Sequence, residues 1–226
     1  LDGMIANVAL PTIADDLGTS AANSIWIVNA YQLVITMSLL SLASFGDLWS
    51  YRKVYLIGLG VFASMSVLCA LSDSLLTLTI ARMLQGLGAA AVMSVNGALT
   101  RLIYPRRILA RGIAINTLIV AVSAAAGPTV AAGVLSIASW PWLFAINVPI
   151  GLLALIMGYR FLPANAGVRE QRFDKLSGLL NAITFGLFFA ALTGFAQGHA
   201  GWMIGLPLVL TIVVGWFFVR RQLDQP

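Results

Sequence analysis

The chain has 226 residues, of which 60% are hydrophobic and only 9% are charged, and its mean hydropathy is +0.94. Soluble domains carry about 25% charged residues, so this composition excludes a soluble globular protein. The formal net charge is +5. The placement of the basic residues explains this charge without a nucleic-acid partner, as shown below.

Several uncharged apolar runs reach about 18 residues or more, the length needed to cross roughly 30 Å of hydrocarbon. They lack the alternation of transmembrane β-strands and therefore predict helices embedded in a lipid bilayer. The first hydrophobic segment is too short to span, and the chain opens at Leu1 without a methionine, so we expect a truncated first helix. We predict an all-α polytopic membrane protein with hydrophobic segments at 1–11, 24–46, 53–71, 75–101, 110–136, 141–162, 176–197 and 201–219.

Basic residues gather at alternate connections between these segments. The other connections, at 12–23, 72–74, 137–140 and 198–200, contain no lysine or arginine. Because basic loops stay in the cytoplasm, the basic connections predict the cytoplasmic side and explain the net charge. The basic residues at or beside these connections, or after the last segment, are Arg52, Lys53, Arg101, Arg106, Arg107, Arg111, Arg160, Arg169, Arg172, Lys175, Arg220 and Arg221.

The longest basic connection, 163–175, is a candidate cytoplasmic linker between a domain at 1–162 and a helix pair at 176–221. No P-loop, nucleophile elbow, zinc-protease motif or Cys-x-x-Cys pair occurs, so we expect neither an enzyme nor a cofactor. No metal-ligand cluster is visible. Cys69 is expected to be a core or lipid-facing residue, and His199, the single histidine, an exposed turn residue.

Two charges fall within apolar segments, where ionised side chains are costly and often functional. Asp2 lies in LDGMIANVALP and would sit at mid-membrane if the first helix is truncated, where a carboxylate can exchange a proton or attract a cation. Arg82 lies in LTIARMLQGLGAAAVMS. It either balances an acid inside the bundle or extends its side chain to the outer surface.

Other polar side chains lie close to these charges in the sequence. Gln85 and Gly86 share a helix face with Arg82, and Gly86 with the small run 88–91 should admit a neighbouring helix. Asn7 adds an amide to the half-helix of Asp2, and Tyr31 lies in the second segment. Single amides at Asn29, Asn96, Asn116 and Asn147 are expected mostly to bridge helices.

Two further segments carry unusual patterns. In the fifth, Ser123, Gly127 and Ala131 form one small-residue face, and Pro128 should bend the helix. This pattern fits either a seam that rocks or ordinary helix packing. In the sixth, which opens with WPWLFAINVPIG, the tryptophans at 140 and 142 are expected at the outer membrane boundary.

Between the second and third segments, LLSLASFGDLWSYRKVY carries one acid, Asp47, and a basic pair that begins with Arg52. This cytoplasmic elbow is either a passive turn or a moving part. The residues alone leave both interpretations open.

Five stretches together resemble the major facilitator superfamily, and more narrowly its 14-helix drug:proton antiporter branch. LDGMIANVALPTI is similar to that branch's first-helix signature, with Met4 in place of Thr, and RMLQGLGAAA matches R-x-x-Q-G-x-G. SAAAGPTVAAG keeps the Gly-Pro of the fifth-helix signature but lacks three of its glycines. WPWLFAINVPIG resembles the sixth-helix signature with Pro141 in place of Arg, and RFDKLSG resembles the start of helix seven.

The resemblance covers essentially the whole chain. It implies a six-helix N-terminal half with its first helix truncated, followed by two extra central helices, with a C-terminal half absent from this chain. It also implies alternating access, in which the two halves expose a midplane site to each side in turn. Asp2 would then be the proton and cation site, Arg82 its coupling partner, and Gly127–Pro128 a hinge-like seam.

The elbow is similar to the superfamily's G-x-L-x-D-R-x-G-R-R/K motif, where Asp47 and Arg52 match the acid and the last basic position. Ala43, Leu48, Ser50 and Tyr51 depart from the motif. In the family the acid helps to latch the outward-facing state. We expect this role for Asp47, with a weaker latch because Leu48 replaces an arginine.

Three functions remain open from the sequence. The first is a proton-coupled exporter of lipophilic drugs or toxic compounds in a bacterial inner membrane, with protons and a small molecule as its partners. The second is a proton-coupled transporter of a metabolite such as an amino acid or sugar derivative, and the third is a membrane scaffold or sensor. The Gly-Pro signature favours export, and Asp2 favours cationic cargo, although proton coupling alone would also explain this carboxylate.

Overall fold

The computed structural model describes residues 2–164, 175–196 and 201–223, and within these ranges every regular element is helical. The predicted all-α architecture is therefore confirmed. In chain order the elements are α1 (Asp2–Asp16), α2 (Ala21–Trp49), α3 (Tyr51–Ala70), α4 (Leu75–Ile103), the short 3-10 helix η1 (Arg106–Ile108), α5 (Leu109–Leu135), α6 (Pro141–Ala145), α7 (Asn147–Phe161), α8 (Lys175–Ala196) and α9 (Gly201–Leu223).

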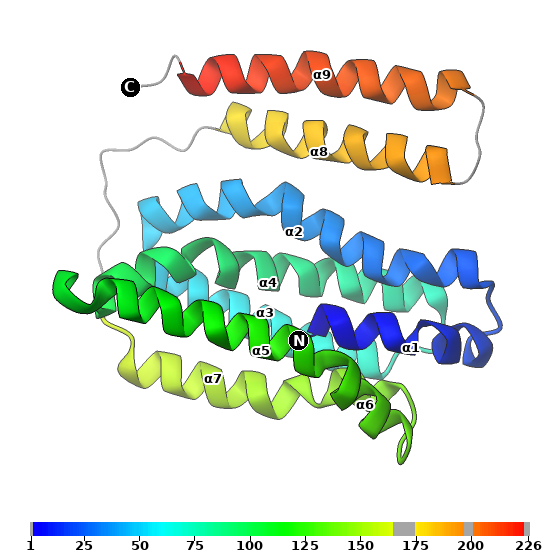
Figure 1. Ribbon diagram of the computed structural model, residues 1–226, viewed down its shortest axis with the longest axis horizontal. Coiled ribbons are helices and arrows are strands. Elements are labelled where there is room, and N and C mark those ends of the chain that lie inside the picture. Colours follow the sequence, from blue (N-terminus) through cyan, green and yellow to red (C-terminus); the bar gives the residue numbers. More distant parts are fainter. Residues whose placement is uncertain (1, 165–174, 197–200, 224–226) are drawn as a thin grey trace.

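Seven helical segments within the described ranges are long and apolar enough to cross a membrane, and they match the second to eighth predicted segments. The segment α1 has 15 residues and is about 22 Å long, which is short of the hydrocarbon thickness. Its first turn lies about midway along the bundle (Figure 1). The N-terminal end of α1 is therefore placed deep between the two ends of the spanning helices.

The sixth segment differs from the single helix expected over 141–162. It is divided at Ile146 into α6 and α7. Pro149 explains the division, because it has no N–H group to donate to the carbonyl of Ala145 one helical turn earlier. The break places Asn147 at the first position of α7.

Trp140, expected at the outer membrane boundary, lies beside the outer end of α1 and is buried there. Only 2% of its surface is exposed, and its indole Nε1 donates to Asp16 Oδ2 at 2.7 Å. This bond joins the last residue of α1 to the residue before α6. Trp142, by contrast, is 62% exposed.

Serine side chains define several helix starts. Ser74 Oγ accepts from the backbone N–H of Thr77 at 3.3 Å, and Thr77 Oγ1 accepts from the N–H of Ser74, which forms a capping box at α4. Ser20 caps α2 in a similar way. Ser50 ends α2 and caps α3 through the N–H of Lys53, so the elbow turns within a single residue.

The helix α4 is the most buried of the spanning helices, and small residues let its neighbours approach closely. A Cβ added to Gly88 would lie 2.7 Å from the backbone nitrogen of Phe62 on α3. A Cβ added to Gly86 would lie 2.8 Å from the carbonyl oxygen of Tyr31 on α2. The predicted role of Gly86 and the following small run is therefore confirmed.

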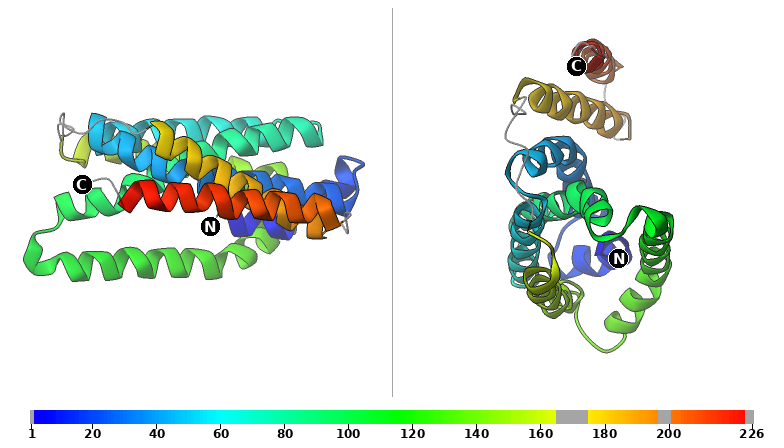
Figure 2. Two further views of the ribbon diagram at one scale, coloured as in Figure 1. Left: turned by 90° about the horizontal axis from the view of Figure 1, so that it is seen from above. Right: turned by 90° about the vertical axis from the view of Figure 1, so that its left-hand side faces the viewer.

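The remaining helices are arranged around this centre. The end view shows α1 enclosed by the other N-terminal helices, with α5 at the right and the α8–α9 pair projecting at the top, beyond α2 (Figure 2). Helix α8 contacts α2, where Asn181 Nδ2 donates to the carbonyl oxygen of Met37 at 3.1 Å. Helix α9 packs on α8.

The basic connections between α2 and α3 and between α4 and α5 lie at the same end of the bundle, together with the end of α9 (Figure 1). This arrangement agrees with the predicted sidedness. The domain boundary within the linker 163–175 stays a prediction, because residues 165–174 lie outside the described residues. His199 also lies outside them, so its expected place in an exposed turn stays a prediction.

Candidate functional site

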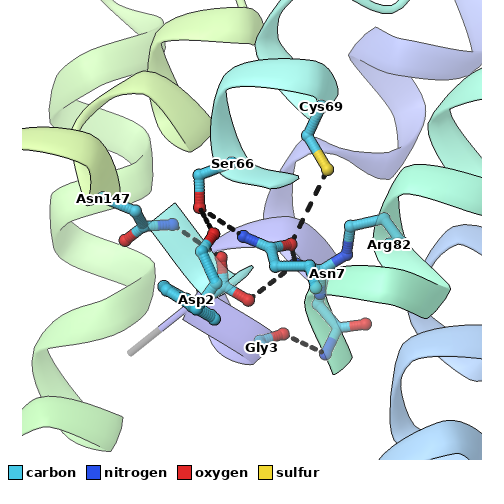
Figure 3. Close-up of polar contacts among 9 residues, drawn as sticks. Asp2, Gly3, Asn7, Ser66, Cys69, Arg82 and Asn147 are labelled. Carbon is cyan, nitrogen blue, oxygen red and sulfur yellow. Dashed lines mark hydrogen bonds and ion pairs between the residues drawn. The ribbon is translucent and has the colours of Figure 1, made fainter. Parts of the chain in front are cut away.

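The centre of the bundle contains an ion pair between α4 and α1. Arg82 Nη1 lies 2.6 Å from Asp2 Oδ2, with the arginine side chain fully buried and the aspartate side chain 10% exposed (Figure 3). Removing two charges from water is costly unless they are paired. Arg82 therefore balances an acid inside the bundle, and the alternative of a side chain that extends to the outer surface is wrong.

The second oxygen of the same carboxylate is also occupied. Asn147 Nδ2 donates to Asp2 Oδ1 at 2.7 Å, and only 7% of Asn147 is exposed. Asn147 thus bridges α7 and α1, as expected of a membrane amide. Asp2 accepts one charged and one neutral hydrogen bond, and these bonds come from two different helices.

A chain of polar side chains supports the cation. Arg82 Nη1 also donates to Gln85 Oε1, and Gln85 Nε2 donates to Ser66 Oγ at 2.7 Å. The Ser66 hydroxyl donates in turn to the carbonyl oxygen of Phe62 at 2.8 Å. The thiol of Cys69 lies 3.7 Å from Gln85 Oε1, a weak contact. This order of donors fixes the orientation of the Gln85 amide.

Aromatic rings cover the faces of the guanidinium. Arg82 Cζ lies 3.8 Å from the ring centroid of Tyr31 and 5.5 Å from that of Phe144. Such contacts stabilise a desolvated cation by roughly 2 kcal/mol. Within the described residues, Arg82 Nε and Nη2 have no hydrogen-bond partner. The guanidinium therefore retains donors for a further acceptor.

The structure thus brings together four of the five predicted coupling residues, Asp2, Arg82, Gln85 and Tyr31. Asn7 is not part of this cluster, because its side chain is exposed and donates to the carbonyl oxygen of Gly3 at 3.2 Å. Ser66 and Phe144 belong to the cluster but were not identified from the sequence. The apolar third segment contains two serines, Ser64 and Ser66, and the sequence has no signal that separates them.

The elbow has contacts of its own. The Tyr51 hydroxyl donates to Asp47 Oδ1 at 2.6 Å. Arg52 Nη2 donates to the carbonyl oxygen of Tyr159, and its guanidinium lies 5.5 Å from the centroid of that ring. The acid is therefore bonded within the elbow, whereas Arg52 ties the start of α3 to the end of α7.

The small-residue face of α5 is turned toward α1. Gly127 and Ala131 are buried and Ser123 is half-buried, whereas Pro128 is exposed. Ala131 packs in the same core as Ile5 of α1. Helix α5 continues through Pro128. The predicted seam is thus a packed contact between α5 and the helix that carries Asp2.

These side chains define the chemistry that the site can support. The carboxylate of Asp2 can take up a proton, and the guanidinium can stabilise the charged form of that carboxylate. Within the described residues, no group of three histidine, cysteine, aspartate or glutamate side chains could hold a metal ion. The fold and the site together define a helical, multi-pass membrane protein with an ion pair buried among its spans.

Comparison with known proteins makes this class specific. The profile of the Major Facilitator Superfamily matches residues 1–218. The chain therefore belongs to the Major Facilitator Superfamily, a family of membrane transporters and not generally of enzymes, as its sequence motifs predicted.

Individual relatives agree with this assignment. The chain is 60% identical over 227 residues to the uncharacterized transporter YebQ of Escherichia coli (strain K12), which covers all of this chain and 50% of YebQ. It is 35% identical over 219 residues to the multidrug resistance protein Stp of Mycobacterium tuberculosis (strain CDC 1551 / Oshkosh), covering 96% of this chain and 39% of Stp. It is 33% identical over 180 residues to the riboflavin transporter RibZ of Clostridioides difficile (strain 630), covering 80% of this chain and 40% of RibZ. The chain spans about half the length of these curated relatives or less.

Proposed function

We propose that this chain is part of a proton-coupled secondary transporter that exports lipophilic drugs or toxic compounds, cationic ones included, by alternating access. The observation that carries this proposal is the buried Asp2–Arg82 ion pair. A structural scaffold gains nothing from an ion pair that is costly to bury, whereas a proton-coupled carrier needs a carboxylate that changes its charge within the membrane.

The proposed cycle uses only groups on this chain for the proton. In the outward-facing state a proton from outside neutralises Asp2, which releases a cationic substrate because their attraction is lost. In the inward-facing state Asp2 gives up the proton, and Arg82 restores the charged pair. The two facing states must differ in affinity for proton and substrate, since only such a difference can drive transport.

The proton gradient is the energy source in this proposal, and no cofactor takes part. A proton-coupled bacterial exporter with this sidedness would lie in the inner membrane. Several relatives carry names that refer to drug resistance, which supports export of toxic compounds. The remaining binding residues would come from a C-terminal half, because the chain corresponds to about half of its relatives.

A second candidate is a proton-coupled transporter of a metabolite. The similarity to a protein named as a riboflavin transporter favours this alternative. Both candidates use the same ion pair and differ in the substrate that occupies the midplane site.

The test is Asp2→Asn in the full-length transporter, reconstituted in vesicles and assayed for ethidium efflux driven by an imposed pH gradient. We expect gradient-driven efflux to fall at least about tenfold, since removal of a buried ionic partner costs about 3 kcal/mol or more. Asp73→Asn is the matched control, because it makes the same chemical change at an exposed outer position.

Two results would contradict the proposal in different ways. Unchanged gradient-driven efflux by Asp2→Asn would remove Asp2 from the coupling mechanism. Transport of riboflavin by the wild type, with no efflux of ethidium or other lipophilic cations, would favour the metabolite transporter.

A further inference from the structure

The ion pair is contacted from one further segment, the turn where α6 ends and α7 begins. Phe144, in α6, lies against the guanidinium of Arg82, and Asn147, at the start of α7, donates to the carboxylate of Asp2. The two residues are three positions apart, and Ile146 between them has right-handed helical torsion angles, so they lie on the same side of the turn. The same turn therefore touches both the cation and the anion.

The turn is also a weak point of the backbone. Ile146 separates α6 from α7, and Pro149 removes the hydrogen bond that would join the two helices into one. Helix α7 packs on α3, where a Cβ added to Gly151 would lie 3.1 Å from the Ala63 Cβ. A change at Asn147 can therefore be taken up at the break while α7 keeps its contact with α3.

The chemistry of the amide distinguishes Asn147 from Arg82. An ionised carboxylate offers only acceptors, so Asn147 must present its Nδ2 donor, as observed at 2.7 Å. A protonated Asp2 carries one O–H donor, which a half-turn of the amide can meet with Asn147 Oδ1. Arg82 has donors only and loses the attraction of the opposite charge when Asp2 is neutral.

We propose that Asn147 is a positioning residue that remains bonded to Asp2 in both protonation states and passes the change to the α6–α7 break. The proton binds at Asp2 Oδ1, and the new O–H bond donates to the reoriented amide. Protonation weakens the bond between Asp2 and Arg82 on α4, so the bond to Asn147 at the α6–α7 break becomes the principal bond of Asp2. Phe144 then shifts with the guanidinium of Arg82, which is held less tightly. This inference rests on the proposed function, since it assigns Asn147 a role in the same proton cycle.

The titratable neighbours of Asp2 do not replace this role. The groups that interact with it electrostatically from the surrounding helices include Arg82 on α4, Tyr31 on α2 and Cys69 on α3. None of these three lies on α6 or α7. Asn147 is the residue of that segment with a hydrogen bond to Asp2 in the described structure.

The first experiment uses Asn147→Leu, which has a similar shape but no polar atom, in the full-length transporter reconstituted in vesicles. Ethidium flux is measured downhill without a pH gradient and uphill with one. We expect the ratio of uphill to downhill flux to fall about tenfold, the factor that corresponds to one lost hydrogen bond to a charged group. Downhill flux of each variant is the reference for its own uphill flux, so the ratio reports the coupling to the proton gradient separately from the overall transport rate.

Two variants accompany this measurement. Asn147→Ser restores a group that can both donate and accept, and it should recover part of the uphill flux. Asn96→Leu makes the identical change toward the cytoplasmic end of α4 and should leave the ratio unchanged. Coupled uphill transport by Asn147→Leu at the wild-type ratio would overturn the inference. If Asn147→Leu keeps the wild-type ratio while Asp2→Asn loses coupled transport in the same assay, the proposed function stands and only the role of Asn147 is refuted.

A second measurement does not depend on folding of the Asn147 variants. Hydrogen exchange of the segment 141–151 is compared between the wild type and Asp2→Asn, which mimics the neutral carboxyl group. We expect exchange at this segment to change at least about threefold, while α9, far from the pair, exchanges as before. Identical exchange of 141–151 in both proteins would overturn the inference.

Discussion

At the scale of single residues, the two members of the ion pair are held differently. Asp2 accepts one bond from Arg82 and one from Asn147, so both carboxylate oxygens are engaged. Arg82 is held by Asp2, by the Gln85 amide and by the flat ring of Tyr31. The shape of the guanidinium therefore matters as much as its charge, because a lysine ammonium cannot reproduce the planar contacts.

Arg82→Lys tests this distinction between charge and shape. The substitution keeps the positive charge beside Asp2 but loses the planar guanidinium that stacks on Tyr31 and donates to both Asp2 and Gln85. We therefore expect coupled efflux to fall about tenfold in membranes that contain the variant at the wild-type level. Gradient-driven ethidium efflux measures this effect. Arg101→Lys, an exposed change at the end of the same helix, is the control. Full activity of Arg82→Lys would mean that charge alone suffices.

At the scale of elements, close approach of α3 and α4 holds the site together, since Ser66 and Arg82 lie on these two helices. The contact depends on Gly88, whose position faces backbone atoms of α3 instead of movable side chains. Backbone atoms cannot rotate away from an added methyl group. The two helices would have to separate, and the bond from Gln85 to Ser66 would stretch.

Gly88→Ala is therefore expected to destabilise the bundle by about 1–3 kcal/mol, the usual penalty for overpacking a tight contact. Thermal unfolding of the purified protein in detergent measures the loss. Gly97→Ala, on the same helix, adds an identical methyl group where nothing lies within 4 Å. Equal melting temperatures for the two variants would show that α3 and α4 can separate without cost.

The same elements show what the sequence could predict. Apolar runs predicted most of the helix positions within a few residues, and charges that are rare in membranes identified Asp2 and Arg82. Ser66 and Phe144 could not be identified, since their role depends on how helices distant in sequence face each other. The contact of Trp140 with Asp16 could not be predicted either, because a tryptophan beside a helix end has the same pattern whether it faces lipid or an aspartate.

At the scale of the whole molecule, alternating access requires a second surface against which this bundle can move. The chain covers about half of its relatives, and many large apolar side chains of its helices are exposed, among them Met83 and Leu87 on α4.

The elbow between α2 and α3 lies at the basic end of the bundle. There Asp47 is bonded to Tyr51, which stands in place of a motif arginine. A neutral phenol can release the acid at a smaller electrostatic cost than an arginine could.

We expect Asp47→Asn to shift the full-length protein toward the inward-facing state, since the proposed latch of the outward-facing state is a charged contact that an amide cannot form. A cysteine introduced at Gly97, in the cytoplasmic half of α4, should then react faster with an impermeant thiol reagent applied from the inner side. The expected increase is about threefold to tenfold, which corresponds to a loss of roughly 1 kcal/mol. Tyr51→Phe, which removes the competing hydroxyl donor and leaves the acid in place, should not increase the reactivity. Unchanged labelling in Asp47→Asn would make the elbow a passive turn whose basic residues serve only to orient the chain in the membrane.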